Sequence, residues 1–324
     1  MRLKHYEKNL IKMNILYKEE LARPKYSCTK KTYDYIIEQG NELNGEYTDE
    51  VLFHCYWSGE LNETHLLSIM SCYYHNIKNY ANRKIILWID GPEDKNKYYM
   101  KINEIVDIKK FDMDELLKDT QFHKTQWNYH HDKNVITEKS NLVRLLLLYV
   151  YGGVWFDLDV LFLKNFSPLL SEYENEVCLY AWQPYNYTNR RKKWVTNYPN
   201  NAIIICPQKN SKKLNDAILY INNLKRGFGF QRGRITYDLP IDFLVLPCYW
   251  FNPQWMGCNP DITFNKNQSW SNPFLETHKL YNFDNFYKGA FAYHWFSSNR
   301  KRLNKNNSTM VQFYDFFEKG VNLK

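Results

Sequence analysis

The sequence lacks the motifs of several large classes of protein. Its seven cysteines are odd in number and scattered, without a Cys-x-x-Cys pair, which argues against a disulfide framework or a zinc ribbon and favours a reducing compartment. It also has no Walker-type phosphate loop, no Gly-x-Ser-x-Gly elbow and no Gly-x-Gly-x-x-Gly fingerprint. The catalytic machinery that depends on those loops is therefore excluded.

Long apolar segments are missing as well. The longest candidate, LVRLLLLYVYGGVWF, is interrupted by Arg144 and by a pair of glycines, whereas a membrane-spanning helix needs about 20 apolar residues. No signal peptide is recognisable. We therefore expect a cytoplasmic protein, with a Golgi-type lumen as the location only if a membrane anchor has been removed.

The composition is that of a folded protein with a basic surface. Of the 324 residues, 44% are hydrophobic and 17% aromatic, and the net charge is +8. These fractions support a large core and exclude wholesale disorder. The first 31 residues hold nine Lys or Arg against three Glu. Such a basic segment suits an anionic membrane surface or another phosphate-bearing partner, and the alternative is a solvated helix surface.

Strand-like and helix-like patterns alternate after residue 48. A short β-branched and aromatic segment, a helical segment and a second buried apolar segment follow one another over residues 50–57, 64–77 and 84–91. This order predicts a βαβ unit and hence a mostly parallel sheet flanked by helices. We expect one α/β domain over 49–324 and a helical N-terminal extension over 1–48.

Two acidic residues interrupt the apolar stretch VYGGVWFDLDVLFL, residues 150–163. If the stretch is one strand, Asp157 and Asp159 point to the same face with Trp155, about 7 Å apart. Their charges repel unless a cation lies near them, and Mn²⁺ or Mg²⁺ commonly joins such carboxylates to substrate phosphates. The alternative is a strand end where both acids reach solvent.

The surroundings of the two acids resemble a known signature. Residues 138–169, EKSNLVRLLLLYVYGGVWFDLDVLFLKNFSPL, resemble the Asp-x-Asp sugar transferases of the glycosyltransferase family 32 type. This group includes yeast initiating mannosyltransferases and α1,4-galactosyltransferases and is related to glucosylating bacterial toxins. The matching residues, in order, are Ser140, Arg144, Tyr151, Gly152, Gly153, Asp157 and Asp159.

The resemblance implies a GT-A-type nucleotide-sugar-binding fold and a retaining, Mn²⁺-dependent glycosyltransferase. Its donor would be a nucleotide sugar, with a UDP-sugar favoured, and its acceptor a hydroxyl of a glycan or glycoconjugate. Asp159 and His294 would bind the metal, and Asp157 would contact ribose, the sugar or the ion through water. Arg144 would hold the sugar or the diphosphate with its planar donors.

The same resemblance extends to the donor pocket. In the first strand, Tyr56, Trp57 and Ser58 would form the base pocket, with Trp57 as the stacking surface. Further donor-binding positions would be Asp90 at the end of the second strand, Ser140 in the helix, and Asn201 near both donor and acceptor.

One residue departs from the family pattern. Asn141 stands where the family carries an aspartate that contacts the donor sugar, and an amide still forms hydrogen bonds but carries no charge. This departure keeps open a catalytically weak or inactive member that binds nucleotide sugars or glycans. A metal-dependent nuclease is a further alternative, although no nucleic-acid partner is expected. The oligomeric state is not indicated by the sequence.

Overall fold

The computed structural model describes residues 30–92, 95–122, 135–181, 187–189, 192–195, 199–223, 243–253, 286–296 and 308–323. Most of the basic N-terminal extension, residues 1–29, lies outside the described residues, so its membrane contact stays a prediction. Helix α2 (Lys30–Glu42) is the described part of that extension.

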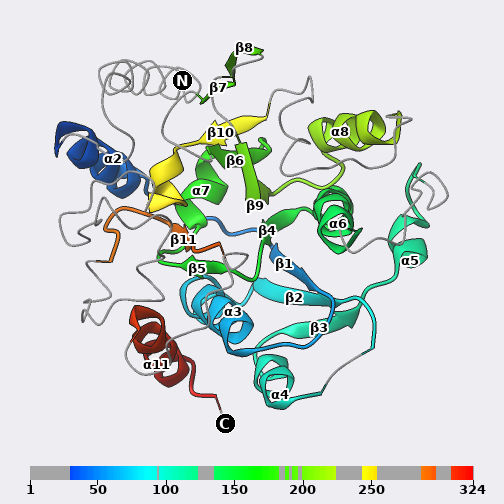
Figure 1. The fold of residues 1–324 in the computed structure, drawn as a ribbon, viewed down its shortest axis with the longest axis horizontal. Helices are drawn as coiled ribbons and strands as arrows, with labels where there is room; N and C mark the ends of the chain where they lie inside the picture. The colour runs from blue at the N-terminus through cyan, green and yellow to red at the C-terminus, as the bar shows by residue number, and fades with distance from the viewer. Residues whose placement is uncertain are drawn as a thin grey trace.

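A seven-stranded sheet in the order β10-β6-β9-β4-β1-β2-β3 forms the centre of the protein (Figure 1). Its strands are β1 (Val51–Trp57), β2 (Arg83–Ile89), β3 (Asp107–Lys110), β4 (Gly153–Phe156), β6 (Cys178–Ala181), β9 (Pro199–Cys206) and β10 (Leu244–Leu246). Every neighbouring pair is parallel except the two pairs that involve β9. The predicted fold class, a mostly parallel central sheet flanked by helices, is confirmed.

The central strands are buried on both faces, as near-continuous apolar strands of a parallel sheet are. One face packs against α3 (Glu63–Asn76), α7 (Ser167–Glu172) and α11 (Thr309–Val321). The other packs against α5 (Met113–Leu117), α6 (Val135–Tyr151) and α8 (Lys212–Asn223). Figure 1 shows α3 and α11 on one side of the sheet and α6 and α8 on the other.

The remaining elements are short or peripheral. They are α4 (Lys97–Asn103), the 3-10 helix η3 (Cys248–Trp250), and the strands β7 (Tyr187–Asn189) and β8 (Lys192–Val195), which pair with each other. In the part of the chain that the structure describes, no helix is both long enough and apolar enough to span a bilayer.

Two glycines connect α6 to β4 in a tight turn. Gly152 and Gly153 have φ angles of +66° and +101°, a backbone region that residues with a side chain rarely adopt. A Cβ on Gly153 would lie 2.1 Å from the carbonyl oxygen of Leu52 in β1. The turn thus brings β4 directly beside β1, with Phe53 opposite Val154, and aims the end of β4 at the carboxyl edge of the sheet.

The predicted single strand over residues 150–163 is wrong. β4 ends at Phe156, a turn occupies 157–159, and β5 (Val160–Phe162) pairs antiparallel with β11 (Ala292–His294) in a separate two-stranded sheet. The Asp157 amide still donates to the Ala202 carbonyl in β9 (2.8 Å), whereas the Asp159 carbonyl accepts from the Trp295 amide (3.1 Å). The chain therefore leaves the main sheet between the two acids, and each carboxylate meets a different set of neighbours.

Candidate active site

The two aspartates lie where parallel α/β sheets bind ligands, just beyond the carboxyl end of a central strand. The turn after β4 carries both of them, and β11 brings His294 alongside because it pairs with β5, the strand that follows the turn. Oδ1 of Asp159 lies 3.3 Å from Nε2 of His294. The structure therefore brings together the predicted metal ligands Asp159 and His294, which are 135 positions apart in the chain.

The other ring nitrogen of His294 contacts a tyrosine that belongs to no motif of the sequence. Nδ1 lies 2.9 Å from the hydroxyl of Tyr180, in β6, and both side chains are buried. Burial, followed by the nearby charges of Asp157 and Asp159, raises the pKa of Tyr180 well above its ordinary value. The hydroxyl therefore stays neutral, and Tyr180, His294 and Asp159 form one chain of contacts.

Asp157 has different partners from Asp159. Its Oδ1 accepts from the indole N–H of Trp155 (2.8 Å) and lies 3.2 Å from Nη1 of Arg144. Burial raises the pKa of Asp157, and Asp159 adds to the rise, while the charge of Arg144 opposes it. Arg144 thus supplies the main positive charge that opposes protonation of this half-buried carboxylate.

Arg144 is itself held by several groups from α6 and β9. Its Nη2 donates to the Ser140 hydroxyl (3.2 Å), its Nε to the Ser140 carbonyl (3.3 Å), and its Nη1 to the Asn201 carbonyl. The guanidinium also lies over the Trp155 ring, 5.0 Å from its centroid. Ser140 and Arg144 therefore serve here to fix Asp157, and their contact with a donor stays a prediction.

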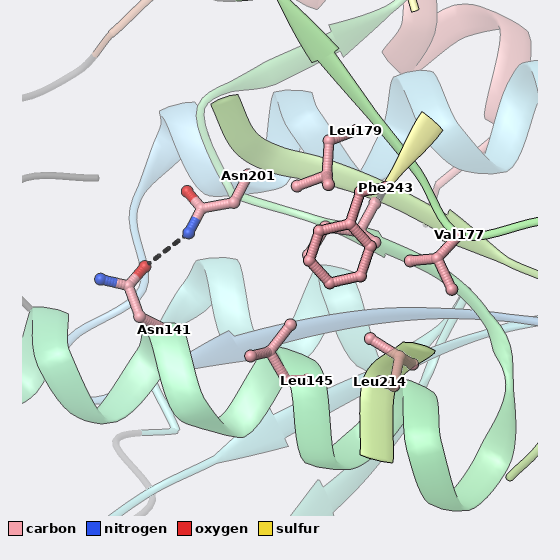
Figure 2. A pocket seen from close by; sticks show the side chains of 8 residues that line it. Asn141, Leu145, Val177, Leu179, Asn201, Leu214 and Phe243 are labelled. Atoms are coloured by element: carbon pink, nitrogen blue, oxygen red, sulfur yellow. Dashed lines mark hydrogen bonds between the residues drawn. The ribbon is translucent and has the colours of Figure 1, made fainter. Parts of the chain in front are cut away.

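Asn141 and Asn201 meet at the edge of a small pocket. The Asn201 amide nitrogen donates to the Asn141 side-chain oxygen at 3.0 Å. Figure 2 shows the pair at one end of a cavity whose other walls are apolar. The cavity is lined by Asn141, Leu145, Val177, Leu179, Asn201, Ile204, Leu214 and Phe243.

The three predicted base-pocket residues lie at the end of β1 and do not share one face of the sheet. Tyr56 and Trp57 follow each other in β1 and therefore face opposite sides of the sheet. Tyr56 donates its hydroxyl to Asp90, whereas the indole N–H of Trp57 donates to the Glu60 carbonyl (3.0 Å). Ser58 follows directly and is half-buried.

Two side chains beside these residues had no sequence signal. Lys139, in the first half of α6, pairs with Asp90 at 2.5 Å. The His65 ring lies against Trp57, with centroids 4.0 Å apart, and burial lowers the pKa of His65 to about 4 although the charge of Asp159 opposes this. Both residues come from helices whose spacing indicated only a buried face, so only the folded chain reveals them.

The donor set at Asp159 and His294 fits a divalent ion that accepts both oxygen and imidazole ligands, as Mn²⁺ does. Among the residues that the structure describes, no group of three or more His, Cys, Asp or Glu is arranged to hold a metal ion. Two protein ligands would thus leave the other coordination positions to substrate phosphates and water, the usual arrangement for ions that act on phosphates.

A family model supports the interpretation of this segment. The model of the glycosyltransferase sugar-binding region containing the DXD motif matches residues 68–176, which include α6, the glycine turn and both aspartates. The match ends before Tyr180, Asn201 and His294. No curated protein matches the chain.

The chain is also similar, at low identity, to several solved structures whose names are those of sugar transferases. The galactosyltransferase LgtC, solved with donor and acceptor sugar analogs, has 11% identity and a TM-score of 0.48, covering 85% of this chain and 96% of its own. The PaToxG glycosyltransferase has 18% identity and a TM-score of 0.39, covering 69% and 73%. Mouse xyloside xylosyltransferase 1 has 11% identity and a TM-score of 0.41, covering 63% and 87%. These likenesses are too distant to assign a substrate.

The segment that matches the DXD sugar-binding region of glycosyltransferases, residues 68–176, contributes β2, β3 and β4 to the mostly parallel sheet and carries both aspartates.

Proposed function

We propose that this protein is a glycosyltransferase that moves a sugar from a nucleotide-sugar donor, with a UDP-sugar favoured, to a hydroxyl of a glycan or glycoconjugate. The observation that carries the proposal is the pairing of Asp159 with His294 at 3.3 Å, beside an Asp157 that Arg144 neutralises. This arrangement lies at the carboxyl edge of the sheet, and both of its acids belong to the segment that matches the DXD model.

Asp159 and His294 would hold Mn²⁺ together with the donor diphosphate. When bound, the ion supplies Lewis-acid stabilisation of the charge that develops on the leaving diphosphate. His294 can bind it through Nε2 only if the ring carries its proton on Nδ1. The Tyr180 hydroxyl, 2.9 Å away, then accepts that proton in a hydrogen bond, so Tyr180 acts as a positioning residue that aims Nε2 at the ion.

Asp157 has a separate task in this proposal. Because Arg144 and Trp155 fix its carboxylate, it offers a rigid acceptor for ribose, the sugar or a metal-bound water. Arg144 acts through Asp157 and through the Asn201 carbonyl that it also holds. The guanidinium N–H groups of Arg144 could contact a substrate only in addition to these contacts within the protein.

For the chemical step we propose retention of the anomeric configuration. Among the described residues around the two aspartates, no side chain stands out as an enzyme nucleophile, so the acceptor hydroxyl attacks the anomeric carbon on the face from which the diphosphate departs. The bond from that carbon to the acceptor oxygen forms as the bond to the phosphate oxygen breaks. The hydroxyl proton passes to the leaving phosphate.

The nucleotide base would lie near the ends of β1 and β2. Trp57 is half-buried and presents an aromatic ring suited to stacking on a base. On the other side of β1, Asp90 is held by Tyr56 and Lys139, which would orient its carboxylate for a hydroxyl of the ribose. Ser58, which directly follows Trp57 in the chain, is the third residue of the predicted base pocket.

The variant Asp159→Asn tests the metal site. It removes the only charge on the carboxylate that faces His294, and we expect Mn²⁺-dependent transfer and donor hydrolysis to be lost while the melting temperature stays near that of the wild type. The matched control is Asp216→Asn in α8, an exposed acid paired with Lys212. Full activity of Asp159→Asn in the presence of a chelator would refute the metal site.

A second function is favoured by one observation. Asn141 is a neutral residue bonded to Asn201, where the related transferases carry an acid. A protein that binds nucleotide sugars without turnover would show affinity for the donor in calorimetry but no release of free nucleotide in the presence of Mn²⁺ and acceptor.

A further inference from the structure

A cavity of about 10 Å³ lies between α6, β6, β9 and α8, and its walls are apolar except at the Asn141–Asn201 pair. That volume is roughly the minimum for one water molecule. A water there would need two to four polar partners, and the walls formed by Leu145, Val177 and Phe243 offer none. The cavity is better suited to a small apolar group than to water.

The amide pair supplies hydrogen-bonding groups at the edge of this cavity. The Asn141 oxygen accepts and the Asn201 nitrogen donates, and here they satisfy each other at 3.0 Å. Figure 2 shows these two atoms facing each other at the end of the cavity opposite Val177. A ligand amide placed between them could donate its N–H to Asn141 and accept from Asn201, so that one hydrogen bond is exchanged for two.

The pair also borders the proposed sugar site. Arg144 donates to the carbonyl of Asn201 and pairs with Asp157, and the Asp157 amide bonds to Ala202, the residue after Asn201. A sugar held at Asp157, as proposed, would therefore lie beside the amide pair.

We infer that the Asn141–Asn201 pair and the cavity behind it form a subsite for the 2-acetamido group of an N-acetylated hexosamine. The two amides bind the N–H and the carbonyl of that group, and the cavity takes its methyl. A hexose with a plain hydroxyl at this position fills no part of the cavity. This inference rests on the proposed function and specifies its substrate class.

Calorimetric titration of the wild-type chain in the presence of Mn²⁺ tests the inference. UDP-N-acetylglucosamine is compared with UDP-glucose for a donor, and methyl N-acetylglucosaminide with methyl glucoside for an acceptor. We expect the acetamido member of one pair to bind about tenfold more tightly or better, the discrimination expected from one apolar group in a fitted pocket. The pair that discriminates identifies the substrate that carries the group.

Val177→Ile adds one methylene to the cavity wall and should abolish the preference while leaving binding of the plain hexose unchanged. Val106→Ile makes the same change at a buried site that does not line the cavity, and should keep the preference. Equal binding within both wild-type pairs, or a preference that survives in folded Val177→Ile, overturns the inference and leaves the proposed function intact. Absence of binding by every nucleotide sugar and glycoside refutes both.

Discussion

Replacing Tyr180 by phenylalanine separates a positioning role from a purely structural one. The change deletes one hydroxyl from a buried side chain and keeps the ring that packs against Phe251, 5.0 Å away between centroids. His294 then loses the 2.9 Å hydrogen bond to Nδ1, which fixes the orientation of the ring and the nitrogen that carries the proton. The His294 side chain stays among the same neighbours, but no hydrogen bond to Nδ1 then holds its Nε2 in the direction of the ion.

The expected effect on metal binding follows from that bond. Loss of a hydrogen-bond partner behind a metal-binding histidine typically weakens metal affinity about 10- to 100-fold, which corresponds to about 1.4–2.7 kcal/mol. The cost of leaving a buried polar group without its partner, about 1–3 kcal/mol, is of the same size. We therefore expect the Mn²⁺ dissociation constant of Tyr180→Phe to rise at least tenfold.

The assay is a titration of Mn²⁺ into purified protein, followed by the electron paramagnetic resonance signal of the free ion. Tyr249→Phe is the matched control, because Tyr249 is also buried and donates its hydroxyl to the Lys288 carbonyl at 3.0 Å. Both variants should lose similar thermal stability, and only Tyr180→Phe should lose metal affinity. A dissociation constant within twofold of the wild type in folded Tyr180→Phe would show that the hydroxyl only stabilises the fold.

Two further predictions concern the frame of the site. Gly153→Ala should lower the free energy of unfolding in urea by more than about 2 kcal/mol, because its Cβ would lie 2.1 Å from a backbone oxygen. Gly91→Ala, with φ +113° and nothing within 4 Å, should cost less, since it adds only the backbone strain, and equal losses would contradict the steric argument. His54 is buried, and burial lowers its pKa from 6.5 to about 4, so the unfolded chain takes up a proton between those values that the folded chain does not. Its contribution to stability should be complete above pH 6.5 and fall by about 3 kcal/mol towards pH 4; a urea midpoint that falls just as steeply in His54→Gln would contradict this.

The elements with a strong local pattern were predictable from the sequence. β1, α3 and β2 follow the predicted order because their apolar spacing and flanking turns agree. The edge strand β3, with the sequence DIKK and exposed on most of its length, had no such pattern. Its strand conformation comes from pairing with β2, which is a property of the sheet and not of the segment.

The contacts of the site were less predictable than its residues. The resemblance predicted that Asp159 and His294 lie close together, because a family pattern can indicate residues far apart in the chain. In the structure the two side chains are 3.3 Å apart. Tyr180 was missed since a tyrosine in an apolar strand is ordinarily a core residue, and only the antiparallel pairing of β5 with β11 places His294 against it. Periodicity along one segment contains no information about such a partner.

The end of strand β4 at Phe156 explains how two carboxylates can lie two residues apart in a largely buried region. In a continuous strand both would face the same partner, and one charge would stay uncompensated. The turn instead places Asp157 beside Arg144, which is a permanent cation. It places Asp159 beside His294, whose imidazole is not a permanent cation. Under the proposed function, Asp157 is therefore the acid that pairs with a cation of the protein itself, and Asp159 is the acid that would hold a divalent ion. The order of the two acids in the motif thus determines their different neighbours, because the first acid still lies next to α6 and the second follows the chain out of the sheet.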